Sequence, residues 1–330
     1  EQIVEHYLCK SRQTFKSKND KSYLSLKLAD KTGTVDAKVW NLGNEIQSFA
    51  ENDMIKIESY HDYYLDEGSM INGVITDDQP IKEILDTIHG NGVKTCRLVI
   101  DSGQIIVKNM NVPFLKKKEI VKIVQDELAA VDQSYEDLIY DYSVLRKNYE
   151  DQPGGEILCC ALERKLLTSY VELFENAGIK LTNVDISVNA LQKLTEELPD
   201  LEHKTYIVSI IDGNNVSSYL FEDNHYTFSN RTRLFSERGT NAFITEMNSN
   251  ISQLIQFNKS KRSLYTIETA YFCGLADDEE PIVMANIKEN LNINAQVFPN
   301  SKVVYVTDAI LANDFKLHDY IYPVGSLIRK

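Results

Sequence analysis

The residues best suited to chemistry lie at a turn between two apolar runs. Asp212-Gly213-Asn214-Asn215 forms this turn, and Ser217 and Ser218 follow it closely. Successive backbone N–H groups and small side chains at such a turn can bind phosphate, and a carboxylate there can orient Mg²⁺ and its water. The same residues are typical of a type I′ β-hairpin turn, because Gly, Asn and Asp tolerate positive φ angles. We prefer the structural hairpin and keep the phosphate loop as its alternative.

The segments around this turn predict a regular order of elements. Residues 206–228 contain three runs rich in Val, Ile, Tyr and Phe, and Glu222-Asp223-Asn224 separates the last two. Such runs around short turns indicate an antiparallel β-meander. A helix is expected next at about residues 237–258, followed by a strand that ends at Gly274 and by another helix.

This order of strands and helices resembles one lobe of the actin-like ATPases. The resemblance implies that the first hairpin turn binds nucleotide phosphate and that a Gly after the later strand lets the backbone approach the adenosine. The candidate residues for ATP with Mg²⁺ are Asp212, Gly213, Asn214, Asn215, Ser217 and Gly274.

Two departures from the actin-like pattern weaken the nucleotide interpretation. When the flanking strands are aligned, the family's Asp-Ile-Gly falls on Ile210-Ile211-Asp212, and Cys273-Gly274-Leu275-Ala276 keeps one Gly where two are usual. The phosphate loop of the first lobe is not recognised in the sequence either. We therefore expect at best weak binding of ATP and no hydrolysis, and we assign no catalytic residue. An active actin-like ATPase is kept as an alternative function.

The upstream segments extend the resemblance to a particular family. A helix-like run ends at His89, residues 93–115 indicate strands, and residues 116–130 indicate an acid-rich amphipathic helix. Residues 156–191 then predict a strand, a helix that ends at a Gly178 cap, and a further strand. From about residue 60 to residue 330, this order resembles the PilM family, the cytoplasmic actin-like component of type IV pilus inner-membrane assembly.

The PilM resemblance implies a fold and a mode of action. The fold is two-lobed and actin-like (RNase H-like), of the α/β or α+β class, with a first lobe at 66–203 that contains an inserted subdomain and a second at 204–330. The implied work is that of a scaffold at the inner face of the cytoplasmic membrane, without insertion into it and with possible self-association. A PilN-like membrane partner would dock its extended tail peptide in a groove, for which our candidates are Ile105, Val107 and Met110.

The first 65 residues predict a separate small module. Residues 22–41 alternate apolar and polar side chains on both sides of Asp30-Lys31-Thr32-Gly33, which predicts two strands and a turn. With residues 3–15 before them and residues 54–60 after, they resemble the OB-fold β-barrel at the start of YhaM-type exoribonucleases. Residues 54–60 fit two interpretations, the last strand of this barrel or the second strand of an actin-like lobe.

Charge is unevenly distributed, and this suggests a second function. Residues 10–38 hold eight Lys or Arg and three Asp or Glu, although the whole chain of 330 residues carries a net charge of −14. Cations beside aromatic rings are typical of surfaces that bind single-stranded nucleic acid. The candidate residues are Lys16, Lys18, Tyr23, Lys38 and Trp40. The alternative is a solvated, Lys-rich edge that prevents sheets from aggregating.

Composition excludes several other classes. No apolar run reaches the roughly 18 residues that a membrane-spanning helix needs. The five Cys and six His have no metal-ligand spacing, so we expect no metal site and reduced thiols of a cytosolic protein. A chain of this length is expected to form two or three cooperative units.

Overall fold

The computed structural model describes most of the chain in two compact units. The described residues are 8–16, 22–29, 34–39, 55–57, 60–66, 68–113, 115–129, 137–148, 154–301, 304–306 and 315–328. One unit holds those up to Tyr60 together with 304–306 and Phe315, and the other holds His61–Ser301 and those from Lys316 on.

The smaller unit contains a three-stranded antiparallel meander and a separate strand pair. The meander runs β1 (Leu8–Lys16), β2 (Ser22–Ala29) and β3 (Thr34–Val39). The short β4 (Ile55–Ile57) pairs in parallel with β17 (Val304–Val306), which comes from near the end of the chain. The described residues form no closed barrel, and several segments of the expected OB module, including Lys18 and Trp40, lie outside them.

In the larger unit, a parallel strand pair is covered by helices. β7 (Thr95–Ile100) pairs with β11 (Lys180–Ile186). Apolar side chains of α1 and α3 form a common core here, which includes Leu85, Leu173 and Ile179. The other elements of this part are the β5–β6 hairpin (Met70–Ile71, Val74–Ile75), α1 (Gln79–Gly90), α3 (Arg164–Asn176) and α4 (Ser187–Glu196). Gly178 follows α3 with a φ of 76°, as expected for a helix cap.

A second sheet of the larger unit has the strand order β8-β10-β9 and is antiparallel. Its strands are β8 (Ile106–Val112), β9 (Leu138–Asn148) and β10 (Gly154–Glu163). The predicted amphipathic helix is confirmed as α2 (Lys117–Ala129), which buries Ile120, Val124 and Leu128 against one face of the sheet. Cys159 and Cys160 lie in β10 as free thiols, and burial raises their pKa to about 11 and about 12.

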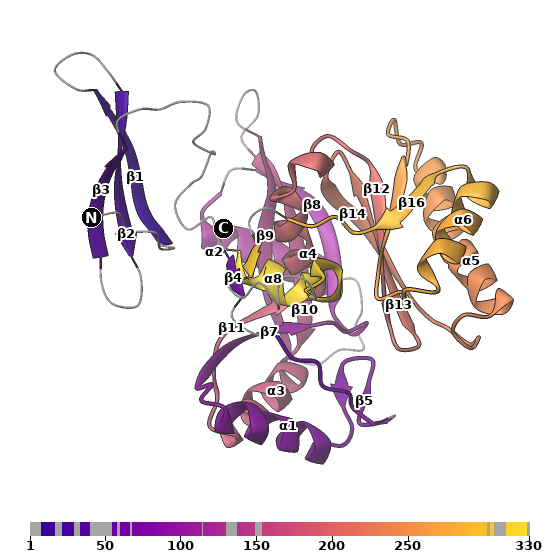
Figure 1. Ribbon diagram of the computed structural model, residues 1–330, viewed down its shortest axis with the longest axis horizontal. Helices are drawn as coiled ribbons and strands as arrows, with labels where there is room; N and C mark the ends of the chain where they lie inside the picture. The colour runs from indigo at the N-terminus through magenta and orange to yellow at the C-terminus, as the bar shows by residue number, and fades with distance from the viewer. Residues whose placement is uncertain are drawn as a thin grey trace. The chain divides into compact units, whose positions relative to one another are not determined.

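The third sheet confirms the predicted meander. Its strand order is β14-β13-β12-β15-β16, and Figure 1 shows α5 and α6 together on one side of it. The helix expected at 237–258 begins later, because the side chain of Thr240 accepts a hydrogen bond from the Phe243 N–H and caps it. The elements are β12 (Tyr206–Asp212), β13 (Asn215–Glu222), β14 (His225–Arg233), α5 (Asn241–Ser260), β15 (Thr269–Cys273), α6 (Glu280–Leu291) and β16 (Asn294–Val297).

The last helix of the larger unit packs closely against α4. In α8 (Ile321–Leu327), a Cβ added to Gly325 would lie 2.0 Å from the Ala190 carbonyl oxygen, so only glycine allows this approach. Arg97 donates to the Ser326 carbonyl at 2.5 Å, at the C-terminal end of the helix where a cation is favoured. No helix among the described residues is long and apolar enough to cross a membrane.

Candidate ligand and docking site

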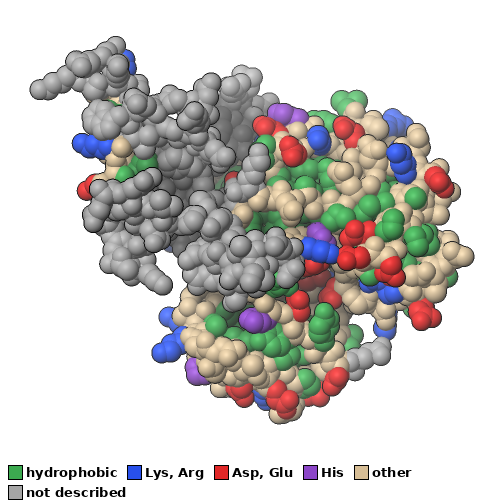
Figure 2. Space-filling model, in the orientation of Figure 1, with side chains coloured by type: hydrophobic (Ala, Val, Ile, Leu, Met, Phe, Trp, Pro, Cys, Tyr) green, Lys and Arg blue, Asp and Glu red, His purple; other side chains and the backbone are tan. Residues whose placement is uncertain are grey.

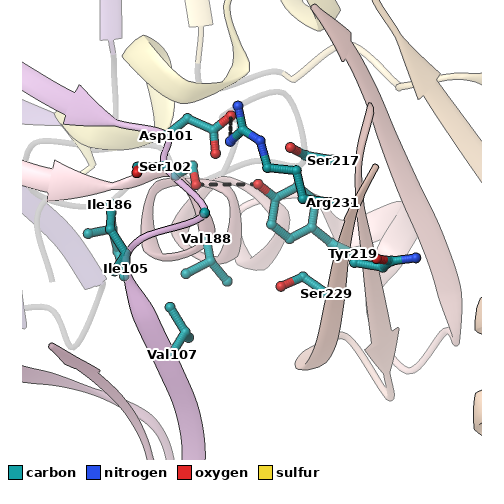
Figure 3. A pocket seen from close by; sticks show the side chains of 13 residues that line it. Asp101, Ser102, Ile105, Val107, Ile186, Val188, Ser217, Tyr219, Ser229 and Arg231 are labelled. Atoms are coloured by element: carbon teal, nitrogen blue, oxygen red, sulfur yellow. Dashed lines mark hydrogen bonds and ion pairs between the residues drawn. The ribbon is translucent and has the colours of Figure 1, made fainter. Parts of the chain in front are cut away.

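A cavity of about 260 Å³ is lined by residues from three of the sheets of the larger unit and from the loops beside them. It is lined by the loop Asp101–Gly103 after β7, by the start of β8, by the first residues of α4, and by β13 and β14 (Figure 3). Segments that are far apart in the sequence therefore build one site. Its volume is near the lower end of the range for small-ligand pockets.

The β5–β6 hairpin positions the loop at Asp101–Gly103. Ser102 Oγ donates to the Asn72 carbonyl at 2.7 Å, and the Gly103 N–H donates to the Asn72 side chain at 3.0 Å. Gly73 has a φ of 77°, and a Cβ there would lie 2.6 Å from Ser102 Cβ. The buried hydroxyl of Tyr170 donates to the Gly73 carbonyl at 2.6 Å. These contacts hold the loop at Asp101–Gly103 in one conformation, so the Asp101 carboxylate has a defined position.

One wall of the cavity is polar. Arg231 of β14 reaches across it and forms an ion pair with Asp101 at 2.7 Å, with Ser217 beside the pair (Figure 3). Tyr219 donates toward Ser187 Oγ at 3.3 Å and shares a 2.7 Å hydrogen bond with Tyr322. Burial raises the pKa of both phenols, so both stay neutral near pH 7.

The opposite wall is aliphatic and includes two of the predicted docking residues. Ile105, Val107 and Val188 line it together with Ile186. Met110, the third candidate, packs with the core beneath α2, on the other face of the β8 sheet. Side chains alternate between the two faces of a strand, so Val107 and Met110 cannot contribute to one surface.

Beyond the cavity, two further contacts connect β8 and β9 to the β13–β14 hairpin. Asn109 donates to the Tyr226 carbonyl at 2.5 Å, and Arg146 lies 3.4 Å from Asp223. Asp223 and Asn224 both have positive φ, the signature of a type I′ turn. A second cavity of about 400 Å³ adjoins this turn, and its lining includes the carboxylates of Glu196, Glu197, Glu202 and Asp223 and the imidazoles of His203 and His225.

The predicted phosphate turn lies apart from the first cavity. Of the six nucleotide candidates, Ser217 alone lines it. Asp212, Gly213 and Asn214 are exposed at the tip of the β12–β13 hairpin, and Asn215 pairs with Asp212. Gly213 has a φ of 54° while Asn214 has no positive φ, which corrects the predicted type I′ turn to one with the positive φ at its first central residue, as in type II′.

Gly274 has a structural explanation. Its φ is 76°, and a Cβ there would lie 2.1 Å from the Ile211 carbonyl oxygen. Its own carbonyl accepts from Arg238 at 2.9 Å, and Arg238 Nε also donates to Glu279 at 2.8 Å. The Arg238 guanidinium lowers the pKa of the nearly buried Glu279 carboxyl. The polar groups of Gly274, Arg238 and Glu279, where an adenosine was expected, are therefore bonded to one another.

The nucleic-acid candidates fall on the smaller unit. Phe15 and Tyr23 stack with ring centroids 5.9 Å apart, and Lys38 Nζ lies 5.7 Å from the Tyr23 ring centre. The register pairs Phe15 with Tyr23, so both lie on one face of the sheet, and Lys16 lies on the other.

The described part of the chain has no cluster of metal ligands. It contains no group of three or more His, Cys, Asp or Glu that could bind a metal ion. The groups that sequence reasoning missed are Asp101, Ser187 and Arg231. No local motif marks them, because they meet only when β7, α4 and β14 come together.

Comparison with known proteins identifies the family. A sequence model described as type IV pilus assembly protein PilM matches residues 45–253, well over half of the chain. The chain belongs to the PilM family. Comparison with curated protein sequences finds no match.

Two solved structures are similar to this chain. A PilM–PilN type IV pilus biogenesis complex superposes with a TM-score of 0.62 at 11% identity, covering 97% of each chain. A Bacteroides thetaiotaomicron protein of unknown function with an actin-like ATPase fold gives a TM-score of 0.44 at 11% identity, covering 88% of this chain and 91% of that one. The predicted family and the two-lobed mixed α/β fold are confirmed. The OB-type barrel stays a prediction.

Proposed function

We propose that this PilM-family chain is a scaffold that docks the extended cytoplasmic tail of a PilN-like membrane protein. The observation that carries the proposal is the position of β8. It is an edge strand of its sheet, and its residue Val107 lines the 260 Å³ cavity together with Ile105, which precedes the strand. An extended peptide can hydrogen-bond to such an edge and place alternate apolar side chains in the cavity.

Charge supports a partner of this kind. The chain carries a net charge of −14, and Figure 2 shows groups of acidic side chains on the described surface. The cavity beside the β13–β14 turn adds four carboxylates. A basic tail close to a membrane would be attracted by such a surface. The scaffold would then act at the cytoplasmic face of the membrane, bound to it through its partner.

The proposed scaffold needs no ATP turnover. In this proposal, the described residues at the exposed β12–β13 turn and at Gly274, whose carbonyl accepts from Arg238, do not hold ATP with Mg²⁺ for hydrolysis. If nucleotide does bind, Ser217, near the start of β13, would be the candidate residue closest to the cavity.

Calorimetry with the tail peptide of a PilN-like protein tests the docking. Val107→Pro should abolish binding, because proline removes a backbone donor and alters the strand edge. Val144→Pro is the matched control, since Val144 is exposed on β9, the other edge strand of the same sheet, and does not line the cavity.

Both proline variants must keep their circular dichroism spectra for the comparison to hold. Val107→Ser, which changes the side chain and leaves the backbone donor, should weaken binding without abolishing it. Equal binding by the Val107→Pro and Val144→Pro variants would show that the peptide does not use the β8 edge.

We also propose nucleic-acid binding by the smaller unit as a second candidate function. The observation that favours it is the Phe15–Tyr23 stack with Lys38 over the tyrosine ring, on a face where Phe15 is 44% exposed. Losing one base–aromatic stack should cost about 1–3 kcal/mol, so Tyr23→Ala should weaken binding of a labelled oligonucleotide by at least about fivefold. No binding to the unaltered chain at about 50 mM salt, where phosphate contacts are strong, would rule this function out.

A further inference from the structure

Several hydrogen-bond donors on the polar wall of the first cavity have no acceptor. Ser217 is 7% exposed and lines the cavity, yet its hydroxyl makes no hydrogen bond within the described part of the chain. The first turn of α4 lies on the same cavity, and its N-cap, Ile186, offers no side-chain acceptor. The first N–H groups of a helix have no partner inside the helix, so they favour an anion.

The same wall already contains one anion. Asp101 is the single acidic residue among those that line the cavity, and its carboxylate pairs with Arg231 at 2.7 Å. An arginine offers five N–H donors in a fixed fork, so a pair with one carboxylate leaves donors for a second. Ser217 is the cross-strand partner of Arg231, so both side chains lie on the same face of the sheet (Figure 3).

We propose that this wall is a carboxylate-binding site, in which Asp101 is the resident anion and an acidic side chain of the docked peptide is the incoming one. Arg231, Ser217 and the start of α4 supply the donors. The aliphatic wall at Ile105, Val107 and Val188 receives the apolar neighbours of that side chain. This preference for an acidic side chain is a property of tail-peptide binding, so the proposal rests on the proposed docking function.

The charge balance of the cavity selects a carboxylate over a phosphate. Arg231 is the single basic residue that lines it. A phosphate would bring about two negative charges at neutral pH beside the Asp101 carboxylate, and no second Lys or Arg among the described residues lines the cavity to offset them. A side-chain carboxylate brings one charge, which the guanidinium can share between two acceptors.

Two capped tripeptides, acetyl-Leu-Asp-Leu-amide and its Leu-Asn-Leu analogue, probe the site in nuclear magnetic resonance titrations of the full chain. The Asp probe should bind at least about tenfold more tightly, because hydrogen bonds to charged groups are the stronger ones. Arg231→Met should remove this preference, Arg231→Lys should keep part of it, and Ser217→Ala should reduce it several-fold. Arg233→Met is the matched control, since Arg233 lies in the same strand and does not line the cavity.

The direction in which Asp101→Asn changes the affinity for the Asp probe distinguishes a ligand site from a structural ion pair. Asp101→Asn removes the competing resident anion and should tighten binding of the Asp probe several-fold, whereas Arg231→Met should weaken it. If both variants weaken binding equally, the pair only holds the sheets together and the proposal is wrong. Displacement of the Asp probe by ATP at equal concentration would also overturn it, because the wall would then prefer phosphate.

The docking function and this site can fail separately. A tail peptide that binds the unaltered chain and the Arg231→Met variant equally would leave docking intact and remove the carboxylate site. Discrimination between the two tripeptides by a chain that binds no tail peptide would leave the site intact and contradict the proposed function.

Discussion

Two polar regions of the five-stranded sheet differ in how their groups are satisfied. At the Gly274 corner, Arg238 serves both the Gly274 carbonyl and the Glu279 carboxylate, and Glu279 in turn accepts from the Ala276 N–H. At the cavity wall, the nearly buried hydroxyl of Ser217 has no protein partner within the described residues. The sequence pattern made both Gly274 and Ser217 candidates for ligand chemistry, and the structure leaves only the second unpaired among the described residues. Polar groups near strand ends are therefore available to a ligand only where the fold leaves them unpaired.

Substitutions in the region of Gly274, Arg238 and Glu279 should lower the free energy of unfolding more than substitutions at the cavity wall. Gly274→Ala should have the largest effect. The added methyl group meets the Ile211 carbonyl in a backbone conformation that alanine disfavours, so we expect about 3–5 kcal/mol of destabilisation in urea unfolding. Gly213→Ala is the control, because its φ is also positive but nothing lies within 4 Å of the added Cβ. It should cost about 1 kcal/mol, and similar losses for both variants would contradict the close packing at Gly274.

Breaking the ion pair between Arg238 and Glu279 should have the next largest effect, and it should depend on pH. Arg238→Met leaves the nearly buried Glu279 carboxylate unpaired and should cost about 3 kcal/mol at pH 7. The pKa of Glu279 is lowered from 4.5 in the folded chain, so its stabilisation is present above 4.5 and lost as pH falls through the lowered value. The difference between the variant and the unaltered chain should therefore shrink below pH 4.5. A difference that stays constant down to pH 3 would show that the ion pair is not its cause.

Two neighbouring serines, Ser217 and Ser218, allow the same comparison with smaller expected changes in stability. Ser218 is buried and bonds to Ser209 at 2.7 Å and to Asn250 at 2.6 Å, whereas Ser217 has no such partner. Ser218→Ala should lower the free energy of unfolding by about 1–2 kcal/mol, because it leaves buried polar groups unpaired. Ser217→Ala should change it by less than about 0.5 kcal/mol. Equal losses for the two variants would mean that Ser217 has a structural role and is not free for a ligand.

The smallest effect is expected from nucleotide. A ligand at a hundred times its dissociation constant stabilises a protein by about 2.7 kcal/mol, which thermal unfolding detects easily. Millimolar ATP with Mg²⁺ should give no clear shift in melting temperature, and Asp212→Ala should leave the melting temperature almost unchanged because Asp212 is exposed. A clear shift with ATP that Asp212→Ala abolishes would restore the phosphate-loop interpretation of the β12–β13 turn.

Much of the fold could be predicted because its signals are local. Strand-like runs around short turns located β12, β13 and β14, and a stripe of apolar residues located α2. Of the three predicted docking residues, Ile105 and Val107 line one cavity and Met110 packs in the core beside α2. Two-residue alternation along β8 already places Val107 and Met110 on opposite faces, so this separation could have been predicted from the sequence.

Other features had no local signal. β4 pairs with β17, a strand from the other end of the chain, and no pattern within residues 54–60 indicates that partner. The segment had fitted two predicted strands equally well, and neither interpretation specified this pairing. Parallel pairing between strands that are distant in the sequence depends on how the intervening segments of the chain fold and pack.

The sequence by itself determined the order of the helices and strands, the antiparallel meander and the family, because periodicity and turn residues act over a few positions. Only the tertiary structure decided which polar groups would be satisfied. The ion pair between Arg238 and Glu279 satisfies the polar groups near Gly274. The ion pair between Asp101 and Arg231 lies at a cavity and leaves guanidinium N–H donors available to a ligand. Each pair joins residues that are distant in the sequence, and the availability of a hydrogen-bonding group depends on its burial and its neighbours in space.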